Sequence, residues 1–166
     1  MVLVADECKV QRESGLTSIW YPRGKYPTVK QDSVREALSF YGALDLATGE
    51  CTVLDTPWQN SKYTVRFLRK LEGGYKGKKV LLIWDGASHH RGEVKNYLAR
   101  KDKDWKLELM YFPAYSPDLN PQEHVWKEAR RHITHNSEDE FEEKTLKFYK
   151  FLVKTKFKSN FLEKYA

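Results

Sequence analysis

Two aspartates, Asp6 and Asp85, each follow a short apolar run. The runs, VLVA before Asp6 and VLLIW before Asp85, are too short for helices, so each predicts a buried strand. Open α/β sheets place their ligands at the carboxyl ends of such strands, so the two carboxylates can share one site. Neighbouring ionised carboxylates imply a bound cation, and all-oxygen ligands favour Mg²⁺ or Mn²⁺. The alternative is that each aspartate only ends a strand or caps the next segment.

A third acid, Glu123, follows Asn120-Pro121-Gln122, which has the form of a helix start with asparagine as the N-cap. Position alone favours a capping-box role for this glutamate. The surrounding run YFPAYSPDLNPQEHVW, at 111–126, is an unusually specific one, in which prolines and an Asx-type turn present the glutamate on the first helical turn. Its resemblance to a known family, given below, is what favours a functional role.

The elements that must position these acids can be traced along the chain. We expect a strand over 2–8, a hairpin over 35–56 that turns at 45–49, a helix over 60–71, a strand over 78–85, a helix over about 91–101, a strand over 105–112, a helix from Pro121 to about His135, and a last helix whose apolar residues run from Phe141 to Phe157. Gly49 suits the positive φ of the hairpin turn. The strand-helix-strand unit implies a parallel crossover, so the fold class is α/β with a mixed sheet.

Composition limits the classes of protein to consider. A chain of 166 residues fits one domain with one core, and no apolar run approaches the ~20 residues that span a bilayer. The start of the sequence lacks the features of a signal peptide, so we expect a cytoplasmic protein in which Cys8 and Cys51 are reduced and buried. The net charge of +6 moderately favours polyanionic partners.

Taken together, the acidic blocks resemble those of mariner-superfamily DDE transposases, in particular the insertion-sequence-630-like branch of bacteria and archaea. The matching segments are VADE at 4–7, FYGALDLATGE at 40–50, WDGASHH at 84–90, and Tyr115–Pro121 followed by Glu123 and Trp126. They occur in the family's order, from Val2 to about Arg131. Two departures are that Gly86 replaces a frequent asparagine and that 38 positions separate Asp85 from Glu123, more than in the animal relatives.

The resemblance implies a ribonuclease H-like fold, a mixed five-stranded sheet with helices on both faces. It also implies that Asp6, Asp85 and Glu123 are the catalytic residues and the ligands of two Mg²⁺ ions, for which Mn²⁺ substitutes. The implied reaction is hydrolysis of phosphodiester bonds at transposon ends and transfer of the freed 3′-hydroxyl to target DNA, expected at a TA dinucleotide. The same resemblance implies that the domain acts as a homodimer in the full assembly, in the prokaryotic cytoplasm and in association with the nucleoid.

Further residues are candidates for contact with phosphate or with the metal ligands. These are Glu7, His90, Asn120 and Lys127. In contrast, His124, His132 and His135 are expected to be exposed helix histidines, and Trp126 is expected to anchor the helix that carries Glu123.

We expect residues 1–166 to form a single catalytic domain. The family's N-terminal helix-turn-helix DNA-binding region is expected to be absent, because the first catalytic strand begins at Val2. Either the chain is a fragment, or it is the second product of a split reading frame and a separate helix-turn-helix subunit supplies that region. Two alternatives stay open. One is a ribonuclease H-like, structure-specific nuclease that cleaves without joining ends, and the other is an inactive transposase remnant reused as a DNA-binding or assembly module.

Overall fold

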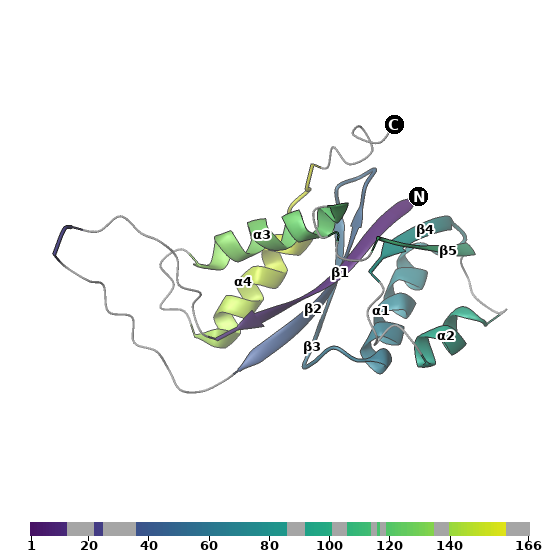
Figure 1. The fold of residues 1–166 in the computed structure, drawn as a ribbon, viewed down its shortest axis with the longest axis horizontal. Helices are drawn as coiled ribbons and strands as arrows, with labels where there is room; N and C mark the ends of the chain where they lie inside the picture. Colours follow the sequence, from purple (N-terminus) through teal and green to yellow (C-terminus); the bar gives the residue numbers. More distant parts are fainter. Residues whose placement is uncertain are drawn as a thin grey trace.

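The computed structural model describes residues 1–12, 22–24, 36–85, 92–100, 106–113, 116, 119–134 and 140–158. In chain order the elements are β1 (Val2–Gln11), β2 (Ala37–Asp45), β3 (Cys51–Thr56), α1 (Ser61–Gly74), β4 (Lys79–Trp84), α2 (Glu93–Leu98), β5 (Lys106–Tyr111), α3 (Pro121–Thr134) and α4 (Phe141–Lys154). They form one five-stranded sheet and its covering helices (Figure 1). None of the helices in the described ranges is long and apolar enough to cross a membrane.

The sheet is mixed, as the sequence predicts, with strand order β3-β2-β1-β4-β5. β1 pairs antiparallel with β2, and β2 pairs antiparallel with β3. β4 runs parallel to both β1 and β5, so the expected crossover through α2 is confirmed. Gly49 has the predicted positive φ, 73°, in the hairpin turn, where the Asp45 carboxylate accepts the backbone N–H of Ala47 at 2.9 Å.

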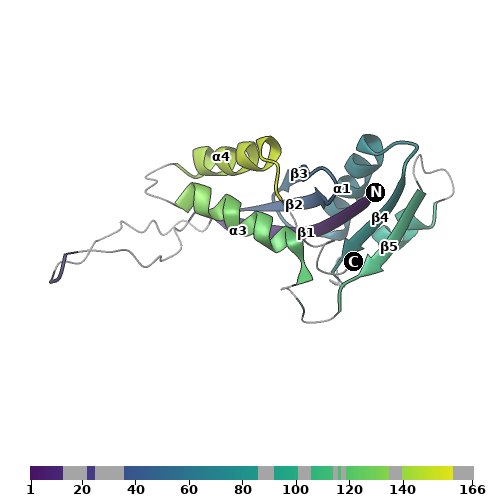
Figure 2. The same ribbon diagram turned by 90° about the horizontal axis from the view of Figure 1, so that it is seen from above.

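Helices cover both faces of the sheet, and the core is therefore in two parts (Figure 2). Alternate residues of β1 point to opposite faces, as the pleat of a strand requires. Leu3 and Ala5 pack with α1 and α2, whereas Cys8 and Val10 pack with α3 and α4. The prediction of a sheet with helices on both faces is confirmed. Cys8 and Cys51 are both free and buried, also as predicted.

The first strand differs from the prediction. It was expected to end near residue 8, but antiparallel pairing with β2 continues to the pair Gln11↔Ala37. Asp6 therefore lies inside β1 rather than at its carboxyl end. The parallel pairing of β1 with β4, in contrast, does end close to Asp6, because its last pair is Val4↔Ile83.

The last helix is shorter than its apolar pattern suggests. It ends at Lys154, and Thr155 has an extended backbone, with φ −91° and ψ 137°. Phe157 thus lies beyond α4, where it is buried and its backbone N–H donates to the carbonyl of Gly49 at 2.8 Å. The apolar pattern of α4 extends to Phe157 because this residue packs in the same core as the helix, although it lies outside the helix.

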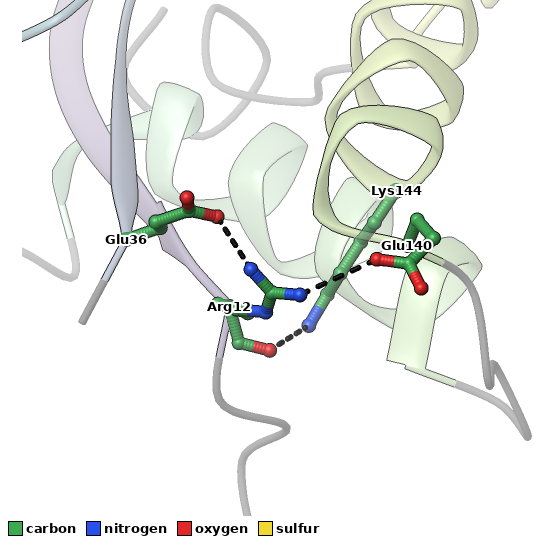
Figure 3. A network of polar contacts seen from close by, with 4 residues as sticks. All are labelled: Arg12, Glu36, Glu140 and Lys144. Atoms are coloured by element: carbon green, nitrogen blue, oxygen red, sulfur yellow. Dashed lines mark hydrogen bonds and ion pairs between the residues drawn. The ribbon is translucent and has the colours of Figure 1, made fainter. Parts of the chain in front are cut away.

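A polar network ties α4 to the end of β1 (Figure 3). The Arg12 guanidinium pairs with Glu36 at 2.9 Å and with Glu140, just before α4, at 3.3 Å. The Lys144 side chain is buried, and its ammonium group donates to the backbone carbonyls of Gln11 at 3.3 Å and Arg12 at 3.5 Å. Exposed ion pairs contribute little to stability, so the buried Lys144 contacts matter more for holding α4 here.

Candidate metal centre

The parallel pairing of β1 and β4 brings Asp6 and Asp85 together. Two residues beyond the pair Val4↔Ile83, the same register places Asp6 level with Asp85. Both side chains then point to the α3 face of the sheet, because Leu3, Ala5, Leu82 and Trp84 belong to the core on the α1 face. One ligand atom from each of Asp6, Glu7 and Asp85 lies within 4.8 Å of the others.

The electrostatics of Asp6 favour a cation beside it. The pKa of Asp6 is raised from 3.8 to about 7, first by burial, then by the negative charges of Glu123, Glu7 and Asp85, against a smaller lowering by the Glu7 backbone N–H. An isolated carboxylate in this position is costly to ionise, and a bound cation would remove that cost. The donors are all carboxylate oxygens, which suit Mg²⁺ or Mn²⁺ rather than zinc. The residues present therefore fit the divalent ion that the sequence suggests.

Glu123 lies near this cluster but is not one of the three residues that form it. It occupies the first turn of α3 and is exposed, whereas Asp6 is only 8% exposed. Its charge is nevertheless the largest electrostatic cause of the raised pKa of Asp6. The predicted role of Asn120 as N-cap is borne out, since its side-chain oxygen accepts the backbone N–H of Gln122 at 3.0 Å.

α3 contacts the cluster through Trp126, which was predicted only to anchor the helix. Trp126 is fully buried, and its indole N–H donates to a carboxylate oxygen of Asp6 at 3.1 Å. Sequence reasoning missed this bond. One available signal was Gly42, because a glycine inside a strand often marks the close approach of another group.

The remaining predicted residues are placed as follows. Lys127 is exposed on α3, one helical turn after Glu123, and His90 lies outside the described residues. The expectation of exposed helix histidines holds for His124, which pairs with Glu128 at 2.8 Å, and for His132; His135 lies outside the described residues.

Comparison with solved structures identifies the fold. The structure of the Mos1 mariner paired-end complex with Mn aligns with a TM-score of 0.70 at 17% identity, over 98% of this chain and 50% of the Mos1 chain. The Mos1 transposase paired-end complex with left transposon end aligns with a TM-score of 0.66 at 16% identity, over 93% of this chain and 48% of the other. The fold is thus ribonuclease H-like, as the resemblance implied.

Sequence comparison agrees. The "Insertion element IS630 uncharacterized 39 kDa protein" of Shigella sonnei is 26% identical over 137 residues, which cover 81% of this chain and 39% of that protein. The present chain thus spans well under half the length of this relative. Residues 1–145 match the family described as DDE superfamily endonuclease, a range that includes Asp6, Asp85 and Glu123. The chain therefore belongs to the DDE superfamily of endonucleases.

Proposed function

We propose that this chain is the catalytic domain of a DNA transposase. It would hydrolyse phosphodiester bonds at transposon ends and join the freed 3′-hydroxyl to target DNA. The observation that carries the proposal is the convergence of Asp6 and Asp85 on the α3 face of the sheet, beside the helix that begins with Glu123. Membership of an endonuclease family supports a nucleic-acid substrate for this site.

In this proposal Asp6, Asp85 and Glu123 hold two Mg²⁺ ions, or Mn²⁺ in their place. When bound, such ions activate a hydroxyl nucleophile and stabilise the negative charge that builds up on the phosphate. Asp85 is only partly buried and Glu123 is exposed, so both carboxylates can bind a metal ion that also contacts a DNA phosphate. Glu7 offers a further carboxylate within the cluster, on the same strand as Asp6.

DNA is the proposed partner, both as transposon ends and as target. The net charge of +6 and the exposed cations Lys127, Arg130 and Arg131 on α3 support contact with phosphates near the metal centre. Such contacts position DNA without reading its sequence and weaken as salt rises. Choice of a TA target, action as a homodimer, nucleoid association and end recognition by a helix-turn-helix segment or subunit belong to the same proposal and follow from the resemblance to mariner-type enzymes.

A metal-dependent nicking assay tests the proposal. Supercoiled plasmid is incubated with Mn²⁺ and the unsubstituted chain, Asp85→Asn, Glu123→Gln, Glu7→Gln, or the control Glu108→Gln. Glu108 is an exposed carboxylate on β5 that pairs with Lys79 at 3.3 Å, away from the cluster. We expect Asp85→Asn and Glu123→Gln to slow nicking about 100-fold or more, because metal-ion catalysis contributes several kcal/mol.

The control is expected to nick like the unsubstituted chain, and Glu7→Gln is expected to lose less than Glu123→Gln. A larger loss in Glu7→Gln would make Glu7, not Glu123, the third ligand. Equal nicking by all variants would show that the activity does not arise from this site. Incubation with pre-cut transposon ends separates a transposase from a structure-specific nuclease, because only the former joins the 3′-end to the plasmid. No cleavage by the folded chain under any condition would favour the inactive module.

A further inference from the structure

We propose that Trp126 is a positioning residue of the metal centre. Its indole N–H would fix one carboxylate oxygen of Asp6 and leave the other to ligate the cation. Through the same contact it would set the position at which Glu123 enters the site. This inference rests on the proposed metal centre but concerns a residue that is not a ligand.

The hydrogen bond between Trp126 and Asp6 joins two buried groups across the interface between α3 and β1. The indole nitrogen lies 3.1 Å from the Asp6 oxygen, and the two residues are 120 positions apart in sequence. An indole can donate but not accept, and it carries no charge. An arginine or lysine here would neutralise the carboxylate and compete with the cation, whereas a neutral donor orients Asp6 and leaves its charge available.

Gly42 makes room for this contact. It lies on β2 directly opposite Asp6 in the antiparallel register. A Cβ atom at position 42 would lie 2.4 Å from Cη2 and 2.8 Å from Cζ2 of Trp126, closer than such atoms can approach. The indole ring therefore passes over the bare backbone of β2 to reach Asp6 on β1. Even the methyl group of an alanine would displace it.

Two further contacts hold the ring and the start of α3 in place. The ring stacks on Phe148 of α4, with centroids 6.2 Å apart and an interplanar angle of 16°. Gln122 is fully buried, and its amide nitrogen lies 3.5 Å from the Cys51 sulfur. Because residues three apart lie on the same side of a helix, Trp126 and Glu123 are carried to the sheet together.

The test measures Mn²⁺ affinity directly, from the electron paramagnetic resonance signal of free Mn²⁺, and so does not depend on nicking. Trp126→Phe keeps an aromatic ring and removes the N–H donor. The matched control, Phe148→Leu, loosens the same packing and leaves the hydrogen bond in place. We expect Trp126→Phe and Gly42→Ala to bind Mn²⁺ about 10- to 100-fold more weakly, the usual effect of losing a group that orients a ligand, and Phe148→Leu to change affinity less than about threefold.

Nicking supplies a rescue experiment. If Trp126 only orients Asp6, saturating Mn²⁺ should restore most of the rate of Trp126→Phe, whereas Asp6→Asn should stay inactive. Equal losses of Mn²⁺ affinity in Trp126→Phe and Phe148→Leu, or no loss in either, would overturn the positioning role. An unsubstituted chain that binds no Mn²⁺ would instead overturn the proposed metal centre itself.

A second measurement uses the unsubstituted chain, so it does not depend on a variant folding. With ¹⁵N-labelled tryptophan, the indole resonance of Trp126 should shift during a Mg²⁺ titration, because its acceptor becomes a ligand. The resonance of Trp58, whose side chain is 60% exposed, serves as the internal control and should not move. A Trp126 resonance that stays in place at saturating Mg²⁺ would contradict the proposal.

Discussion

At the scale of single residues, Asp6 is where burial and charge conflict most strongly. It is almost fully buried, and nearby acids approach it from its own strand, from the end of β4 and from the first turn of α3. A carboxylate in such surroundings holds its proton to higher pH than usual, which explains a pKa of about 7. Without a divalent cation, the folded state therefore accommodates the ionised form of Asp6 poorly.

This conflict predicts a pH-dependent stability. Because the pKa of Asp6 is higher in the folded chain than the 3.8 expected when unfolded, its stabilising contribution is complete below about pH 4 and is lost as pH rises through about 7. Asp6→Asn removes this titration and keeps an acceptor for Trp126. In thermal melts with chelator, the melting temperature of Asp6→Asn relative to the unsubstituted chain should rise between pH 5 and pH 8. A difference that does not change with pH would mean that Asp6 ionises normally.

At the scale of elements, the hairpin between β2 and β3 is held to the segment that follows α4. Gly49 has φ 73°, and a Cβ atom there would lie 2.5 Å from the carbonyl oxygen of Phe157. Gly77 has nearly the same φ, 72°, but a Cβ atom there would meet nothing within 4 Å. The two glycines thus share a backbone conformation and differ in their surroundings.

Alanine substitutions can separate these two effects. Gly77→Ala should lower the free energy of unfolding by about 1 kcal/mol through left-handed backbone strain alone. Gly49→Ala adds the collision with the Phe157 backbone, and we expect a total loss of about 2 to 4 kcal/mol. Urea unfolding of both variants provides the comparison. Equal losses would show that the Phe157 segment moves aside at little cost.

Much of this element structure was predictable because its signals are local. The apolar run before Asp85 predicts β4, the helical spacing over 60–71 predicts α1, and the turn at 45–49 predicts the hairpin. The features that were missed depend on distant partners. β1 is longer than its apolar run because β2 pairs with it to Gln11, and Phe157 is buried by a turn more than a hundred positions earlier.

The candidate site shows the same division. The approach of Asp6 to Asp85 follows from two neighbouring parallel strands, each of which the sequence reveals by its apolar run, although Asp6 lies inside β1 and not at its end. The bond from Trp126 to Asp6 needs the exact packing of α3 over Gly42, which no local pattern encodes. Glu7 and Glu123 both raise the pKa of Asp6. Glu7 is its neighbour on β1, whereas the approach of Glu123 depends on how α3 packs against the sheet.

At the scale of the whole molecule, the sheet has fewer strands on one side of the metal centre than on the other, because β4 and β5 end there. β4 ends at Trp84, whereas β1 continues to Gln11 beside β2 and then contacts α4 through Lys144. The strands β3, β2 and β1 form one part of the sheet and β4 and β5 form the other, and the two parts are joined through the short parallel pairing of β1 with β4, from Val2↔Leu81 to Val4↔Ile83. Asp6 and Asp85 stand immediately beyond that junction.

A cation shared by Asp6 and Asp85 would therefore link β1 to the end of β4 just beyond their last paired residues, and amide hydrogen exchange should detect this link. Ligand at 100 times its dissociation constant adds about 2.7 kcal/mol against any opening that separates its two ligands. Amides between β1 and β4 should then exchange on the order of 100-fold more slowly in Mg²⁺. The Asp45 amide donates to the Glu50 carbonyl at 2.9 Å in the hairpin turn. If the hairpin opens independently of the metal centre, the exchange rate of this amide should change far less. Uniform slowing at both places would mean that β1 and β4 separate only when the whole domain unfolds.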